Sequence, residues 1–229
     1  MKIKGLIENS FLDWDGKIST IVFTGGCNFR CPFCHNKELV LDSGKMADIS
    51  EDYIFNYIVT HKKWIDGVVV TGGEPLLQPD ILEFLQKIKN AGFLVKLDTN
   101  GYLPELLKKA VNQGLVDYVA MDLKSGISVD RYSAATGTKI DIEKIKQSIN
   151  FLLENHVEYE FRTTIVPTLV TLEDLQDIAK NIKPESKWAW QNFRKTETLV
   201  DPALLMFPEY VKKDLDEFEN NLNRKIIRR

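Results

Sequence analysis

Three cysteines lie within eight residues of one another, in the segment CNFRCPFC, and the sequence contains no others. Cys27, Cys31 and Cys34 are an odd number, which does not suit a set of disulfides, and a structural zinc site usually takes four ligands. Three thiolates on one loop can instead hold three irons of a cubane [4Fe–4S] cluster and leave the fourth iron open. An open iron can bind a substrate or a second cofactor, whereas a fully ligated cluster mainly transfers electrons.

The residues around the cysteines suit a bulky bound group. Gly25 and Gly26 come directly before Cys27 and would let the backbone approach such a group. Phe33 comes directly before Cys34 and would shield a cluster from water. The alternatives are cysteines of the core or of a zinc site, but structural cysteines rarely gather so closely on one loop. The spacing therefore favours a cluster.

The elements that must position this loop alternate between strands and helices. Apolar runs predict strands at 18–23, 67–71, 93–98, 118–122, 158–166 and 187–193, and helical patterns predict helices at 48–64, 80–91, 103–113, 141–155, 172–182 and 208–224. Because parallel strands need long crossovers, such a series predicts an α/β fold with a parallel sheet. A closed eight-stranded barrel usually takes about 250 residues. We therefore predict one domain over residues 1–229, a partial (β/α)6 TIM-type barrel, with an irregular active-site loop at 124–139.

Polar residues follow several of the predicted strands. The cysteine loop follows the first strand, and the segments 72–75, 98–101 and 122–124 follow the next three. Arg162 falls within the fifth strand and Gln191 lies near the end of the sixth. In parallel α/β folds the active site forms at the carboxyl ends of the strands. These side chains are therefore predicted to converge on one rim.

The C-x3-C-x2-C spacing on the loop after the first strand resembles the motif of the radical S-adenosylmethionine (SAM) superfamily. The resemblance implies that Cys27, Cys31 and Cys34 ligate a [4Fe–4S] cluster, and that the amino and carboxylate groups of SAM chelate its open iron. It also implies that one-electron reduction cleaves SAM to a 5′-deoxyadenosyl radical, which abstracts a hydrogen atom. In such chemistry the protein orients the cofactor and excludes water.

The segment TGGEP, residues 71–75, resembles the second motif of that family. Gly72 and Gly73 would let backbone carbonyls approach the amino group of SAM, and Glu74 would add a charge-assisted hydrogen bond. Two glycines at a strand end are by themselves usually a turn. Their place downstream of the cysteine loop favours the role that the resemblance implies.

The segments LDTNG, residues 97–101, and MDLK, residues 121–124, resemble the activators of glycyl-radical enzymes. The resemblance implies that Asp98, Thr99 and Asp122 hold a monovalent cation near SAM, for which oxygen ligands are suited. It also implies that Lys124 reaches the carboxylate of SAM, and it places Asn100 among the cofactor-binding residues. The simpler alternatives are a turn or helix cap at Asp98 and a solvated Lys124.

Further likeness, to activators of anaerobic ribonucleotide reductase, covers residues 12–17, 27–36, 160–164 and 189–194. It implies that Arg162 and Gln191 belong to the SAM site, although an ordinary ion pair and a glutamine on the rim are alternatives. Because no cysteine lies outside the motif, we predict no second cysteine-ligated cluster. The electron is then expected from an external flavodoxin- or ferredoxin-like donor.

The resemblance predicts an enzyme that generates a glycyl radical on a partner protein of the anaerobic ribonucleotide reductase or pyruvate formate-lyase type. One alternative is a radical SAM enzyme that acts on a small molecule or RNA, similar to 7-carboxy-7-deazaguanine synthase. An alternative of another class is a non-catalytic module that binds zinc or an iron–sulfur cluster.

The net charge and the distribution of apolar residues limit which classes of partner are expected. A net charge of −3 gives no support for nucleic-acid binding, which usually shows a basic patch. The sequence contains no apolar run of the length needed to span a membrane, so no membrane partner is expected. No signal peptide is recognisable. A cytoplasmic location is therefore expected, and it suits reduced thiols.

Overall fold

A single curved sheet organises the residues that the structure describes, which are 1–196, 198–222 and 224–229. In this computed structural model β1 pairs antiparallel with β2, and each later pair of neighbours is parallel. The strands lie side by side in chain order. They are β1 (Ile3–Ser10), β2 (Ser19–Thr24), β3 (Gly67–Gly72), β4 (Leu94–Thr99), β5 (Tyr118–Asp122), β6 (Glu158–Ile165), β7 (Trp188–Asn192) and β8 (Ile227–Arg228).

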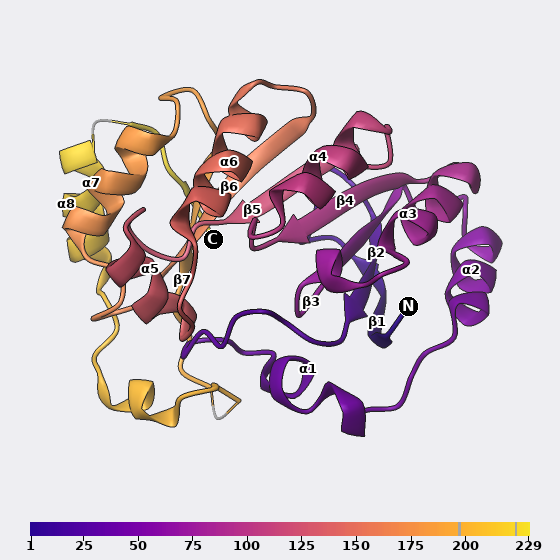
Figure 1. Cartoon of the computed structure of the whole chain (residues 1–229), viewed down its shortest axis with the longest axis horizontal. Helices are drawn as coiled ribbons and strands as arrows, with labels where there is room; N and C mark the ends of the chain where they lie inside the picture. The colour runs from indigo at the N-terminus through magenta and orange to yellow at the C-terminus, as the bar shows by residue number, and fades with distance from the viewer. Residues whose placement is uncertain (197, 223) are drawn as a thin grey trace.

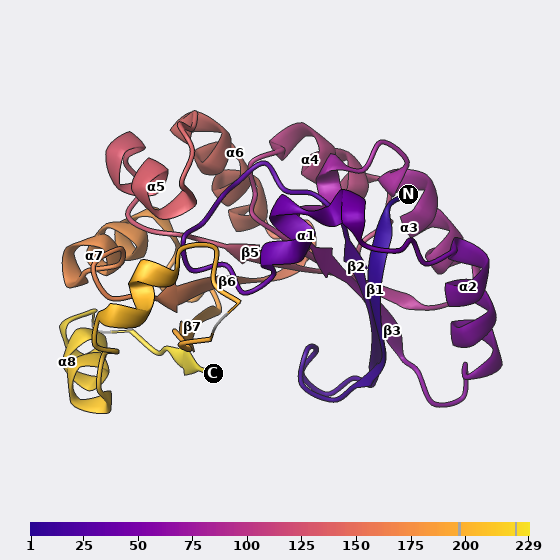
Figure 2. The same ribbon diagram turned by 90° about the horizontal axis from the view of Figure 1, so that it is seen from below.

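The strands of this sheet curve, and helices lie along its convex side (Figures 1 and 2). In the parts of the chain described, no helix has the length and apolar character needed to cross a membrane. The helices are α1 (Lys37–Leu41), α2 (Glu51–Thr60), α3 (Ile81–Asn90), α4 (Pro104–Asn112), α5 (Val129–Thr136), α6 (Ile142–Leu153), α7 (Leu172–Asn181) and α8 (Lys212–Leu222).

The sheet does not close into a full barrel. Its order runs from β1 to β8, and among the described residues no pairing joins these two edge strands. At one end of the gap, Arg229 after β8 forms an ion pair of 3.0 Å with Asp15 in the β1–β2 connection. Figure 2 shows that connection curling on the concave side of the sheet. The partial barrel predicted from the sequence is therefore confirmed, with an opening between its edges.

Each of the six predicted strands and six predicted helices has a counterpart, with differences at the ends. The helix predicted at 208–224 is α8, described from Lys212 to Leu222, and residue 223 lies outside the described residues. Ser50 caps α2, because its hydroxyl accepts a hydrogen bond from Tyr53 N at 3.2 Å. The prediction of an irregular loop at 124–139 is wrong, since α5 lies within it. That helix buries Tyr132 and Ala135 and ends at Gly137, whose φ of +64° favours glycine.

Two groups of buried side chains set where a ligand can enter. The larger group fills the space between the sheet and the helices. A smaller group packs on the concave side of the sheet and consists of Trp14, Ile21, Val69, Tyr118 and Ala120. These residues stand nearer the amino ends of the strands than the polar residues that follow them. The carboxyl ends are therefore left to polar side chains and an open cavity.

Candidate functional site

A cavity of about 310 Å³ lies at the carboxyl ends of the parallel strands. Side chains from the loop after β2 and from the ends of β3 to β7 line it, so the strand ends converge as the sequence predicted. Its lining includes every predicted site residue except Glu74: Cys27, Cys31, Cys34, Gly72, Gly73, Asp98, Thr99, Asn100, Asp122, Lys124, Arg162 and Gln191.

Backbone hydrogen bonds from distant segments hold the cysteine loop in place. Arg30 N donates to Thr136 O at the end of α5, at 2.8 Å. A Cβ on Gly137 would lie 2.3 Å from Arg30 O, so the absence of a side chain there permits this contact. Phe29 and Phe33, which belong to this loop, are buried and line the cavity. The short helix that the sequence analysis missed therefore supports the loop.

The three thiols are free and fit a metal cluster. Burial raises the pKa of Cys27 to about 11 and that of Cys31 to about 12. Ionised thiolates in this place therefore need a nearby positive charge, which bound irons would provide. Three soft sulfur donors on one loop are the ligand type that iron–sulfur clusters take.

The two glycines at the end of β3 bring the backbone there against the cysteine loop. A Cβ on Gly73 would lie 1.9 Å from Gly26 O, and one on Gly72 would lie 2.3 Å from Thr24 N. Gly72 also has a φ of +125°, which L residues rarely adopt. With this close approach, Glu74 N donates to Gly26 O at 2.8 Å. The two motifs are thus joined directly through backbone.

Glu74 lies beneath this junction with 1% of its surface exposed. Its carboxylate accepts hydrogen bonds from Leu76 N at 3.1 Å, Thr99 Oγ1 at 2.8 Å and Asn100 N at 2.7 Å. Burial raises its pKa to about 7, against the lowering effect of the hydrogen bonds from Asn100 and Thr99. Glu74 therefore shapes the loop after β4, and its contact with SAM stays a prediction.

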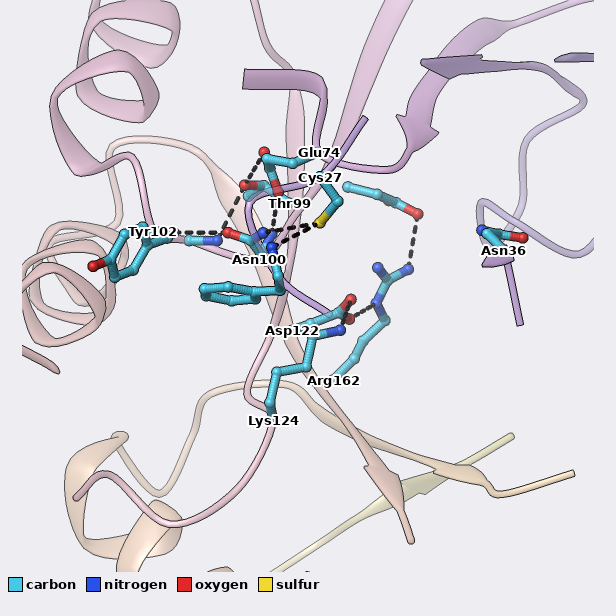
Figure 3. Close-up of polar contacts among 12 residues, drawn as sticks. Cys27, Asn36, Glu74, Thr99, Asn100, Tyr102, Asp122, Lys124 and Arg162 are labelled. Atoms are coloured by element: carbon cyan, nitrogen blue, oxygen red, sulfur yellow. Dashed lines mark hydrogen bonds and ion pairs between the residues drawn. The ribbon is translucent and has the colours of Figure 1, made fainter. Parts of the chain in front are cut away.

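Charged side chains form a cluster in the cavity, made of Asp98, Asp122, Lys124 and Arg162; Figure 3 labels the last three. Arg162 lies between two carboxylates, with Nη1 2.9 Å from Asp98 Oδ2 and Nε 2.8 Å from Asp122 Oδ1. Lys124 Nζ lies 2.9 Å from the second oxygen of Asp122. These four side chains thus present two positive and two negative groups to the same cavity.

The charges in this cluster stabilise one another. Burial alone would raise the pKa of Asp122, but Arg162 and Lys124 outweigh it and hold that pKa at about 2. Burial would lower the pKa values of Lys124 and Arg162, but Asp122 raises both above their ordinary range. All three are therefore charged at neutral pH.

The predicted monovalent cation at Asp98, Thr99 and Asp122 is not tested by this arrangement. The guanidinium of Arg162 supplies a positive charge between the two aspartates, and the hydroxyl of Thr99 donates to Glu74. Across the described ranges, no three Cys, His, Asp or Glu side chains converge as ligands of one metal ion. The cation therefore stays a prediction.

Below the cluster lie charged residues that the sequence analysis missed. Lys96 and Glu160 are 3% and 1% exposed, and Lys96 Nζ lies 3.9 Å from Asp98 Oδ1 and 3.7 Å from Glu160 Oε1. Arg229 pairs with both oxygens of Glu160, at 2.8 and 2.9 Å. Lys96 and Glu160 each precede a cluster residue by two positions, and in a strand that spacing places side chains on the same face. This two-residue spacing within a strand was the feature of the sequence that could have identified Lys96 and Glu160 as neighbours of the charged side chains.

His35, after the last cysteine, packs into the neighbouring loop. Its Nε2 lies 2.8 Å from Arg194 O, and its ring stacks on Phe193 with centroids 6.4 Å apart. Asn36 beside it reaches Gly72 O at 3.5 Å. The contacts of His35 tie the cysteine loop to the segment after β7, and that of Asn36 ties it to the end of β3.

Comparisons with known proteins agree with this geometry. A family-wide sequence model, that of the Radical SAM superfamily, matches residues 21–182. A protein of Methanocaldococcus jannaschii, named as a glycyl-radical enzyme activating enzyme, is 37% identical over 83% of this chain and 79% of its own length. The pyruvate formate-lyase-activating enzyme of Clostridium pasteurianum is 31% identical over 94% of this chain and 87% of its own.

A solved structure shares the fold. Streptococcus suis SuiB bound to S-adenosylmethionine aligns with 91% of this chain at a TM-score of 0.63 and 13% identity. This chain spans 51% of the SuiB chain. At that identity the similarity concerns the fold alone.

Proposed function

Because the chain belongs to the radical SAM superfamily, whose members use a [4Fe–4S] cluster and SAM, we propose that it activates a glycyl-radical enzyme. The observation that carries the proposal is the convergence of three free thiols and a balanced four-charge cluster on one cavity. The two relatives reported above, both named as activating enzymes, support the choice of reaction.

The charge pattern suits SAM, which carries a carboxylate, an ammonium and a sulfonium. Lys124 and Arg162 are the cations that can receive the carboxylate, and Asp98 and Asp122 can attract the positive groups. Gly72 and Gly73 bring the backbone close to the cysteine loop without side chains in the way. We assign Cys27, Cys31 and Cys34 as the cluster ligands.

A bound cluster and SAM would supply a 5′-deoxyadenosyl radical to the cavity. The chain's own residues would orient SAM through the charge cluster and exclude water with Phe29 and Phe33, which are buried at the cavity wall. The sequence contains no cysteine outside the motif, so the electron would come from a separate flavodoxin- or ferredoxin-like protein.

The substrate that we propose is one glycine in a loop of the partner enzyme. A glycyl Cα radical is stabilised by the flanking amides, and glycine has no side chain to obstruct the approach. The gap between β1 and β8 leaves one side of the sheet open, as a loop of another protein would require. A cavity of about 310 Å³ is of the size that small-molecule sites have, so the partner's loop would enter only in part.

The test is electron paramagnetic resonance of an anaerobic mixture of reconstituted protein, SAM, a reductant and a candidate partner. The partner would be an anaerobic ribonucleotide reductase or a pyruvate formate-lyase encoded beside this protein. We expect a glycyl-radical doublet that is absent with Cys31→Ala, because two remaining thiolates do not hold the cluster. Cleavage of SAM without a doublet for any such partner would contradict the proposed substrate, and a doublet with Cys31→Ala would contradict the ligand assignment.

A further inference from the structure

The side-chain amide of Asn100 lies beside the sulfur of Cys27. Asn100 Nδ2 is 3.9 Å from Cys27 Sγ, within reach of an N–H···S hydrogen bond (Figure 3). The backbone N–H of Phe29 donates to the same sulfur at 3.4 Å. Asn100 is also 6% exposed and lines the cavity. One predicted cluster ligand therefore has two neighbouring N–H donors.

The surroundings of Asn100 fix which end of its amide faces the sulfur. Its Oδ1 accepts a hydrogen bond from Tyr102 N at 3.0 Å. Its Nδ2 donates to Asn28 Oδ1 at 2.8 Å, so the NH₂ group must lie on the side of Asn28 and Cys27. A flipped amide would place its oxygen against Asn28 Oδ1 and its NH₂ against a backbone N–H, losing both bonds.

Glu74 holds the backbone of Asn100 from below. Its carboxylate accepts the N–H of Asn100 at 2.7 Å and the hydroxyl of Thr99 at 2.8 Å. The loop after β4 thus has little freedom to move its amide away from Cys27. A further hydrogen-bond donor lies next to Asn100, since Asn28 Nδ2 is buried and has no partner among the described residues.

We propose that Asn100 donates a hydrogen bond to the cluster sulfur of Cys27 and thereby raises the reduction potential of the cluster. Hydrogen bonds to the sulfurs are among the factors that set such potentials. The reduced cluster carries one more negative charge than the oxidised one, so an N–H donor stabilises the reduced form more strongly. Asn100 is then a residue that favours the electron transfer which precedes SAM cleavage, and Glu74 and Asn28 are its positioning residues. The proposal rests on the assignment of Cys27 as a cluster ligand.

The test measures the midpoint potential of the cluster in SAM-free, reconstituted protein by a redox titration followed by electron paramagnetic resonance. Asn100→Leu removes the donor at similar volume and leaves little room for a replacing water. At the wild-type midpoint we expect its ratio of reduced to oxidised cluster to fall by about tenfold, which corresponds to about 59 mV.

Asn100→Asp keeps an acceptor for Tyr102 N, and thus the shape of the loop, but also removes the donor. We expect its midpoint to fall at least as far as that of Asn100→Leu. Asn112→Leu, at an exposed position at the end of α4, is the matched control and should leave the midpoint unchanged. If Asn100→Leu does not retain iron, Asn100→Ala, which also removes the donor and adds no charge, decides the question.

An unchanged or raised midpoint in an Asn100 variant that retains full iron content would overturn this inference and leave the proposed function intact. A midpoint that changes only when SAM is present would also overturn it, because the amide would then serve SAM. Wild-type protein that binds no cluster after reconstitution would instead contradict the proposed function itself.

Discussion

Replacement of the buried Glu74 by alanine should destabilise the protein, because the carboxylate accepts three hydrogen bonds from other parts of the chain. Three donors, Leu76 N, Thr99 Oγ1 and Asn100 N, would lose their acceptor at a site that is 1% exposed. A buried donor without a partner costs about 1–3 kcal/mol, and water entering the vacated space favours the lower figure. We therefore expect Glu74→Ala to lose about 3 kcal/mol of unfolding free energy.

For a chain of this size, 1 kcal/mol shifts Tm by about 2–4 °C, so the Tm of Glu74→Ala should fall by roughly 6–12 °C. The assay is thermal unfolding followed by circular dichroism, with SAM affinity measured by calorimetry on the same samples. Glu83→Ala, at an exposed position on α3, is the control and should change stability by less than about 0.5 kcal/mol. A Glu74→Ala variant with the wild-type Tm and weakened SAM binding would refute the reasoning, because the carboxylate would then be free to serve SAM.

Two further substitutions test contacts that support the site. One is the close approach of Gly73 to the cysteine loop, and the other is the ion pair of Asp174 on α7 with Arg131 on α5, the helix that holds that loop. Gly73→Ala would place a Cβ 1.9 Å from Gly26 O, so we expect it to lose about 1–3 kcal/mol of unfolding free energy and to bind SAM more weakly. Gly44→Ala is the control and should change neither property, because its Cβ would meet open space. Equal SAM affinities of Gly73→Ala and wild type by calorimetry would contradict this expectation. Burial would raise the pKa of Asp174, but hydrogen bonds from Arg131 and from backbone outweigh it and hold that pKa below 3.8. That stabilisation is complete above pH 3.8 and is lost as the pH falls through the folded-state pKa. Asp174→Asn should therefore lower the free energy of unfolding by about 2 kcal/mol at pH 7. In urea unfolding, the difference in this free energy between wild type and Asp174→Asn should shrink toward pH 3. A difference that does not change with pH would contradict the stabilising role of the ionised carboxylate.

Much of the fold was predictable because its strands are nearly continuous apolar runs. The segment 67–72 is buried for most of its length and needs no knowledge of its partners to be recognised. β1 was missed because several of its residues are exposed and its pairing with β2 is its main support. α5 was missed because it is short and depends on the packing of Tyr132 and Ala135, which sequence periodicity does not reveal.

The cysteines and the strand-end polar residues were predictable from their spacing and position, and the structure brings them together in one cavity. Their partners were not predictable, since these come from other strands. Arg162 reaches Asp98 and Asp122 from β6, across separations of 64 and 40 residues. Lys96 and Glu160 lie two positions before Asp98 and Arg162, so the strand period could have placed them on the same faces, but their ion pair between β4 and β6 was visible only in the structure.

The most direct test of the central claim follows the hydrogen atom from the partner's glycine. The partner enzyme would be prepared with α-deuterated glycine and incubated anaerobically with the reconstituted protein, SAM and reductant. The account predicts that 5′-deoxyadenosine gains one deuterium in step with the growth of the glycyl-radical signal. Unlabelled 5′-deoxyadenosine in the presence of a growing glycyl radical, or no 5′-deoxyadenosine from protein that holds a reduced cluster, would contradict it.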